Sequence, residues 1–178
     1  MNQAHPSKRP SAAALVAVRE LQEILDTQAE GYRRLLATIE RQREAIRTAD
    51  IAAVPDIAGV QEKIVQRLKV LDDRREIAGA TVATALGIDA DSTISIIASV
   101  LPSGTADRLE VRAAELRQLV EQARREQSLV RNAGEALARH MAGIVQSVTG
   151  ALSGTGVYGR RGRLREGSPL VAGVDLTS

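Results

Sequence analysis

Apolar residues recur every seven positions between Ser11 and about Asp50, and charged residues fill much of the surface between them. Such a 3.5-residue repeat is typical of an amphipathic helix that packs along other helices. Ser11 is the expected N-cap, while Gly31 is an interior position that costs the helix about 1 kcal/mol relative to alanine. The two columns of the repeat are Val18, Leu25, Tyr32, Ile39 and Ile46, and, three residues later, Leu21, Gln28, Leu35 and Gln42.

A second helix is predicted after the segment ADIAAVPDI. Because proline disfavours the helical conformation in the residue before it, we expect Val54 to lie outside the helix and the helix to begin near Pro55 or Asp56. Gly87 is the expected C-terminal stop. The apolar stripe between these ends is Ile57, Val60, Ile64, Leu68, Leu71, Ile77 or Ala78, Val82 and Leu86.

The remaining pattern predicts one short helix and one long one. Asp91 or Ser92 can cap a short helix, which Pro102-Ser103-Gly104 ends. A long helix is then expected from Thr105 to about Leu152. Its seven-residue column is Leu109, Leu116, Ala123, Val130, Leu137, Ile144 and Ala151.

No segment of useful length alternates as a β-strand does. We therefore predict an all-α fold: an elongated antiparallel helical bundle of three long helices plus one short helix, over residues 11–153. Residues 1–10 are expected to be a flexible N-terminus. Residues 154–178 are expected to be a flexible, disordered tail rich in glycine and arginine.

The composition narrows the chemistry further. Aromatic residues make up only 1% of the chain, so the core must be built from leucine, isoleucine, valine and alanine. The absence of cysteine excludes disulfides, thiol catalysis and zinc–thiolate sites. We find no signal-peptide pattern and no run of about 18 uncharged apolar residues, and we expect a cytoplasmic protein with no membrane insertion. The net charge of +2 resides in the tail, which leaves the helical body neutral.

The tail contains a formal match to the dinucleotide fingerprint G-x-G-x-x-G, at Gly154, Gly156 and Gly159. That site needs a strand before it and a helix after it, and here a long helix precedes it. The two histidines, His5 and His140, stand apart, and no His/Asp cluster with metal-ligand spacing is present. The sequence therefore predicts no enzyme, no cofactor, no metal site and no small-molecule substrate.

Two kinds of macromolecular partner remain. Nucleic acid is disfavoured because the body has no basic stripe, although the tail arginines can neutralise phosphates. An amphipathic partner helix is favoured, since the stripe of the long C-terminal helix can accept one. Periodicity alone leaves open whether this stripe is a groove, the protein's own core or a dimer seam. The candidate residues for binding a partner helix are Leu116, Val120, Val130, Leu137, Met141 and Ile144.

The chain resembles the FlgN-type flagellar export chaperones over about residues 12–165. The resemblance lies in the layout of QAEGYRRLLATIERQREAI, IAGVQEKIVQRLKVLDDRREI, STISIIASVLP and LRQLVEQARREQSLVRNAGEAL, and in the tail motif Tyr-Gly-x-x-Gly. Sparse positions within this layout also match, namely Leu35, Leu36, Glu62, Leu68, Leu71, Arg75, Leu116, Asn132, Leu137, Tyr158, Gly159 and Gly162.

The resemblance implies a cytosolic chaperone that acts without nucleotide and carries hook-associated flagellar proteins to the flagellar export apparatus. It also implies that the C-terminal part engages the cargo and that a tyrosine near the end docks on the export gate. The candidate docking residues are Tyr158, Arg160, Arg161 and Arg163. The alternative is a coiled-coil adaptor or a self-associating structural protein without a flagellar role.

Overall fold

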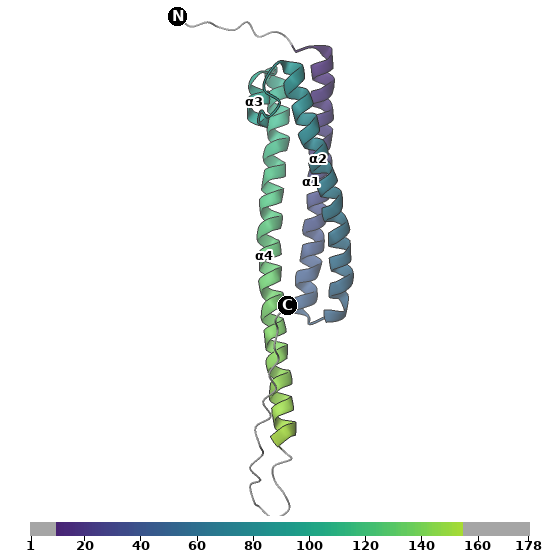
Figure 1. Cartoon of the computed structure of the whole chain (residues 1–178), viewed down its shortest axis with the longest axis vertical. Coiled ribbons are helices and arrows are strands. Elements are labelled where there is room, and N and C mark those ends of the chain that lie inside the picture. Colours follow the sequence, from purple (N-terminus) through teal and green to yellow (C-terminus); the bar gives the residue numbers. More distant parts are fainter. Residues whose placement is uncertain (1–9, 155–178) are drawn as a thin grey trace, which may run out of the picture. The chain divides into compact units, whose positions relative to one another are not determined.

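The computed structural model describes residues 10–154 of the chain, with side chains to residue 151. These residues form four α-helices and one short 3₁₀ turn, and no strand occurs among them. The elements are α1 (Ala12–Arg47), η1 (Ile51–Ala53), α2 (Val54–Leu86), α3 (Ile94–Ser99) and α4 (Ser103–Gly154) (Figure 1). The predicted all-α fold of three long helices and one short helix is confirmed. Of the predicted flexible segments 1–10 and 154–178, residues 1–9 and 155–178 lie outside the described residues. Gly154 was assigned to the flexible tail, and the structure instead makes it the last residue of α4.

The described chain divides into two units, which meet between Gly134 and Glu135. In the first unit, α1, α2 and the first 32 residues of α4 lie side by side, and α3 lies at one end of them (Figure 1). Consecutive long helices run in opposite directions, so α1 and this part of α4 are parallel. The described part of the second unit is a single element, the remainder of α4.

Two of the predicted helix ends are confirmed. The Ser11 hydroxyl accepts a hydrogen bond from the backbone N–H of Ala14 at 3.1 Å, which caps α1. Gly87 ends α2 with φ of 73°, a left-handed conformation that glycine adopts without the steric cost other residues meet.

Two other predictions at helix ends are wrong: the non-helical conformation of Val54 and the residue that caps α3. The second helix does begin near Pro55, as expected. Val54 is helical (φ −61°, ψ −45°) and begins α2, because η1 leads into the helix and Pro55 falls in the first turn, where no N–H is needed. The cap of α3 is Thr93, whose hydroxyl accepts from Ile96, and neither Asp91 nor Ser92 caps that helix.

The core of the first unit consists of two aliphatic clusters. Apolar residues of the heptad columns on α1 contribute to both of them. The first cluster joins α1, α2, α3 and α4, and the second joins the three long helices further along. Their buried members are Val18, Leu21, Ile24, Leu25, Ala78, Val82, Ala83, Ile97, Leu101, Leu109 and Leu116 in the first, and Leu35, Ile39, Leu68, Ala123 and Val130 in the second.

One buried position of the α1 repeat is polar. Gln28 falls in the sequence between Leu25 of the first cluster and Leu35 of the second, and it is only 3% exposed. Its side-chain Oε1 has no hydrogen-bond partner among the described residues. An unpaired buried acceptor costs about 1–3 kcal/mol, so this side chain weakens the bundle.

Gly31 allows α1 and α2 to approach closely. A methyl group placed on its Cα would lie 2.7 Å from Cδ2 of Leu68, a distance that real Cβ atoms do not reach. Leu68 is buried in the second cluster. Glycine at this position lowers the helix propensity of α1, but it lets α1 and α2 pack closely at Leu68.

Candidate helix-binding surfaces

The structure separates the six residues that the sequence proposes for cargo binding. Leu116 and Val130 are buried core residues, and Val120 packs against the first cluster. Side chains from α1 cover Leu116 and Val130, so these two residues hold α4 on the bundle and present no surface to a partner. In contrast, Met141 is 50% exposed and Ile144 is 47% exposed, and Leu137 is intermediate.

The exposed members belong to one apolar face of the second unit. No other described element of that unit covers the helix. At 100° per residue, positions 137, 141, 144, 145 and 148 fall within about 100° of the helix circumference, which is the width of a typical apolar stripe. Val145 and Val148 are not among the six sequence candidates, although their spacings of four and seven from Met141 indicate them. We call Leu137, Met141, Ile144, Val145 and Val148 the terminal face.

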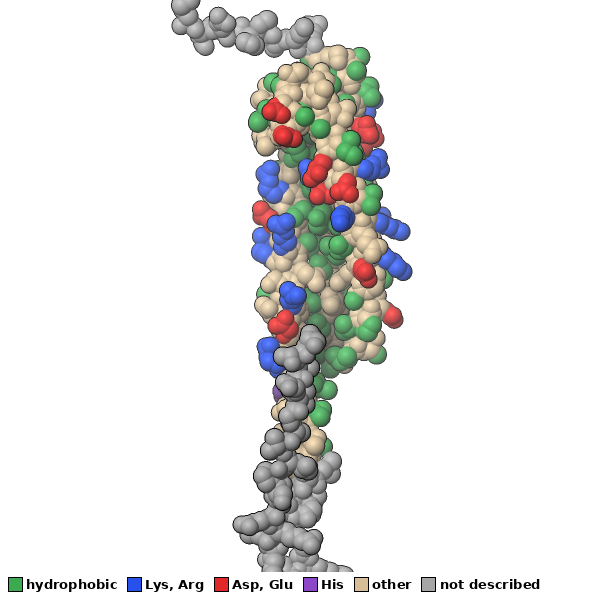
Figure 2. Space-filling view, viewed as in Figure 1, with side chains coloured by type: hydrophobic (Ala, Val, Ile, Leu, Met, Phe, Trp, Pro, Cys, Tyr) green, Lys and Arg blue, Asp and Glu red, His purple; other side chains and the backbone are tan. Residues whose placement is uncertain are grey.

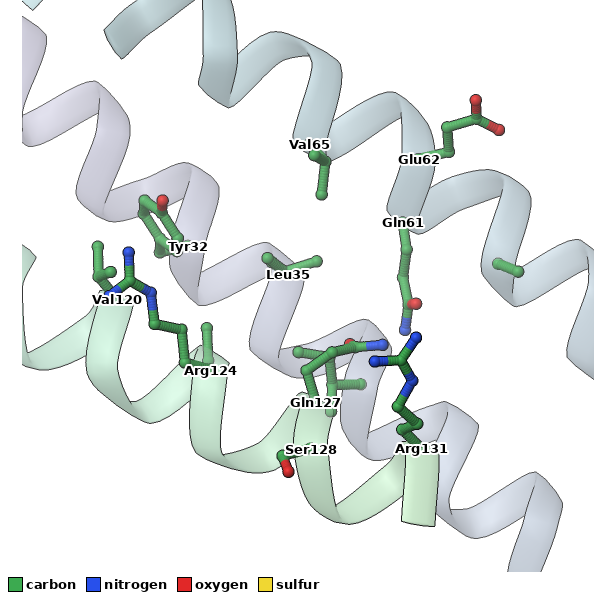
Figure 3. A pocket seen from close by; sticks show the side chains of 13 residues that line it. Tyr32, Leu35, Gln61, Glu62, Val65, Val120, Arg124, Gln127, Ser128 and Arg131 are labelled. Carbon is green, nitrogen blue, oxygen red and sulfur yellow. The ribbon is translucent and has the colours of Figure 1, made fainter. Parts of the chain in front are cut away.

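A second candidate surface lies in the first unit. There the helices enclose an open groove of about 720 Å³, with α1 as its floor and α2 and α4 as its walls (Figure 3). The space-filling view shows the same region as a strip of hydrophobic side chains between two columns that carry charged side chains (Figure 2). We call this the lateral groove. Its lining is Tyr32, Leu35, Ile39, Ala58, Gln61, Glu62, Val65, Val120, Ala123, Arg124, Gln127, Ser128 and Arg131.

The lateral groove coincides with a small residue in the α4 column. Ala123 stands where the preceding and following members of the column are Leu116 and Val130. Its single methyl group fills less space against α1 than those side chains do. The groove was not predicted from the sequence, but an alanine between two larger residues of the column is a signal that points to it.

The rim of the lateral groove is polar and carries charges of both signs. On the α2 side, Gln61 donates from Nε2 to Oε1 of Gln42 on α1 at 3.0 Å, and Glu62 stands beside it. On the α4 side, Arg124 extends toward Tyr32, and Arg131 points toward Gln61 (Figure 3). The α4 wall is therefore basic, and the acidic side chain of the rim comes from α2.

Ion pairs join α1 to the first part of α4. Exposed pairs of this kind each contribute about 0–1 kcal/mol, so they set the register of the two parallel helices more than they stabilise them. The pairs are Asp26–Arg112 at 2.9 Å, Arg43–Glu126 at 3.5 Å, and Arg33–Glu115.

The described residues show no metal site and no membrane-spanning helix. No group of three or more His, Asp or Glu side chains there is placed to hold a metal ion. No helix of residues 10–154 has the length and apolar content that crossing a membrane requires. Gly154, the first glycine of the fingerprint, is the last residue of α4, so a helix and not a strand leads into the motif. Its other glycines lie outside the described residues, as do the candidate docking residues Tyr158, Arg160, Arg161 and Arg163.

This fold places the chain in the class of all-helical bundles with uncovered apolar surface, the kind of surface on which amphipathic helices dock. Within this class, the family model described as FlgN protein matches residues 17–166, which is most of the chain, and the chain belongs to the FlgN family. Proteins of this family are non-enzymatic cytoplasmic chaperones that hold hook-associated flagellar proteins for export. No curated protein and no solved structure matches the chain.

The family match confirms the resemblance drawn from the sequence and the function that it implies. The alternative of a structural coiled coil without a flagellar role is not supported.

Proposed function

We propose that the terminal face holds an amphipathic helix of a hook-associated protein. The observation that carries this proposal is the exposure of its apolar side chains, which is 62% for Val145 and 53% for Val148. The spacing of these side chains matches the i, i+3, i+4, i+7 pattern by which helices dock on one another. The sequence candidates Leu137, Met141 and Ile144 belong to this surface, whereas Leu116 and Val130 are withdrawn from it because they are buried.

The size of the terminal face indicates a moderate affinity. Complete burial of a large aliphatic side chain contributes about 1.5–3 kcal/mol, so five side chains that are already partly covered contribute about 4–7 kcal/mol together. Association costs at least about 4 kcal/mol in translational and rotational freedom. The surplus is small, which suits a chaperone that has to release its cargo at the export apparatus.

The test compares Ile144→Asp with Gln146→Asp in the full chain. The two positions lie about 200° apart on the same helix, so both changes introduce the same charge and only the first places it in the terminal face. Isothermal titration against a purified hook-associated protein should show at least a tenfold loss of affinity for Ile144→Asp and little change for Gln146→Asp. Equal affinities for the two variants would refute the terminal face as the cargo site.

We further propose that Tyr158, with Arg160, Arg161 and Arg163, docks the loaded chaperone on the export apparatus. The support is the sequence: an aromatic side chain among glycines, beside a run of arginines, in a chain whose core is aliphatic. Burial of one aromatic side chain contributes about 2–3 kcal/mol, so Tyr158→Ala should weaken docking about fiftyfold. The arginines mainly accelerate encounter, a contribution that salt screens.

Surface-immobilised export-gate protein provides the assay for docking. Tyr158→Ala should weaken gate binding while helicity and cargo affinity stay at wild-type values. Replacing Arg160, Arg161, Arg163 and Arg165 by serine should remove the salt-dependent part of the association rate. Gate binding that is unaffected by Tyr158→Ala would show that the tyrosine is not the anchor.

A further inference from the structure

We propose that the lateral groove binds a second amphipathic helix, one with acidic residues along one flank, supplied by the same hook-associated cargo. This inference rests on the proposed function and adds a second contact site in the first unit. The groove is separate from the terminal face, since every residue that lines it lies before Glu135.

The shape and lining of the lateral groove suit a helix. Three long helices surround a volume within the range of protein binding pockets, with Leu35 and Ile39 in its floor. Val65 on the α2 wall is 51% exposed, which leaves apolar surface to be covered. A helix laid between α2 and α4 would convert three long helices into a four-helix arrangement, in which each apolar stripe faces another.

The charge of the α4 wall specifies the chemistry of this helix. Arg124 and Arg131 line the groove seven residues apart, and Arg117 precedes them at the same interval. Arg117 and Arg124 take part in no ion pair within residues 10–151. Arginines at heptad spacing along one wall match carboxylates at heptad spacing on an adjacent helix. A helix with lysines at those positions would meet like charges instead.

The cargo is the occupant to which we commit, because the terminal face alone is a small site. It comprises five side chains along about three turns of helix. Once the cargo is bound at one site, its binding at the second site is intramolecular. Two weak contacts together can therefore give a higher overall affinity than either contact alone. Each contact can then be released separately.

Designed peptides test the chemistry of the lateral groove. Two 21-residue amphipathic helices would share the same leucine pattern and differ in one flank, which carries glutamate every seven residues in one peptide and lysine in the other. Fluorescence anisotropy with the full chain should show the glutamate peptide binding at least tenfold more tightly. Arg124→Glu should reduce this preference several-fold, because it places a negative charge among the arginines of the α4 wall. Equal binding of the two peptides would overturn the proposed chemistry.

Matched variants on α2 locate the binding. Val65→Asp should reduce binding of the glutamate peptide at least tenfold, whereas Val70→Asp, a change of the same kind at an exposed valine outside the groove, should leave it unchanged. Arg74→Glu serves as the charge control for Arg124→Glu, because it makes the same change of charge on the face of α2 about 180° from Val65. Peptide binding that is the same in Val65→Asp and Val70→Asp would overturn the location.

Titration of the full-length hook-associated protein separates this inference from the proposed function. Val65→Asp and Arg124→Glu should each weaken cargo binding at least tenfold, in addition to the loss caused by Ile144→Asp. If only Ile144→Asp weakens binding, the lateral groove is not a cargo site and the proposed function stands. If only the groove variants weaken it, the terminal face is refuted instead. Concentration-dependent dimers that Val65→Asp abolishes, with cargo affinity unchanged, would show that a second copy of the chain is the occupant.

Discussion

Replacing Gly31 with alanine sets helix propensity against tertiary packing. Alanine in the interior of a helix is favoured over glycine by about 1 kcal/mol, and on that ground alone the variant should be more stable. The added methyl group, however, would lie 2.7 Å from Cδ2 of Leu68 and 3.4 Å from its Cγ. Leu68 is buried in the second core cluster, so its side chain cannot move aside freely.

The balance of the two effects gives the expected result. Forcing an extra carbon into a well-packed core costs about 1–3 kcal/mol. Subtracting the gain in propensity leaves Gly31→Ala between neutral and about 2 kcal/mol less stable than the wild type. Gly79→Ala on α2 is the matched control, because nothing lies within 4 Å of the added methyl group there. That variant should be about 1 kcal/mol more stable than the wild type.

Urea unfolding followed by far-UV circular dichroism measures both variants. The free energies of unfolding of Gly31→Ala and Gly79→Ala should differ by about 1–3 kcal/mol, with the Gly31 variant lower. Leu68→Ala removes the atoms that obstruct the methyl group. In that background, Gly31→Ala should therefore stabilise the protein as the control does, a coupling that a double-mutant cycle reports.

If Gly31→Ala were as stabilising as Gly79→Ala in the wild-type background, the close approach of α1 and α2 at Leu68 would be refuted. The same conclusion would follow if Leu68→Ala left the effect of Gly31→Ala unchanged, since the penalty would then have another origin.

Three further predictions concern the core and the charged surface. Gln28→Met should raise the free energy of unfolding by about 1 kcal/mol, because it removes the unpaired Oε1 at similar volume, and a lower urea midpoint would contradict the burial of that atom unpaired. Val130→Asp should lower it by more than about 3 kcal/mol with loss of helical signal, whereas Ile144→Asp should unfold at the wild-type urea concentration. Arg47 donates hydrogen bonds that lower the pKa of Glu44 from its ordinary value of 4.5. The stability from this exposed contact is present above that value and is lost as the pH falls through the lowered pKa, so Glu44→Gln should slightly reduce the loss of stability as the pH falls below 4.5.

The heptad columns predicted most of the fold because burial in a helical bundle follows a 3.5-residue period. Val18, Leu25 and Ile39 of one column are all buried, as that period requires. The helix ends at Ser11 and Gly87 were also predictable, because each depends on local chemistry. The Ser11 hydroxyl caps α1, and Gly87, which has no side chain, adopts the left-handed conformation that ends α2. The prediction from local sequence was wrong at Val54, because the preceding 3₁₀ turn offset the preference that proline imposes on the residue before it.

The candidate surfaces were only partly predictable, since a column of apolar residues does not reveal where its covering helices end. Val130 and Ile144 occupy the same column of α4, yet one is core and the other is half exposed. The lateral groove depends on how three helices meet around Ala123 and Tyr32, which are distant in the sequence. The role of Gly31 depends likewise on Leu68, a contact between helices that no local pattern contains.

Hydrogen exchange of the full chain, alone and with a purified hook-associated protein, tests most directly where this chaperone holds its cargo. We predict that the cargo slows amide exchange in residues 137–148, because a docked helix suppresses local opening of an otherwise uncovered segment. Residues 18–25, which are already buried in the first cluster, should exchange at the same rate in both samples. Formation of the complex with unchanged exchange in residues 137–148 would contradict the assignment of the cargo to the terminal face.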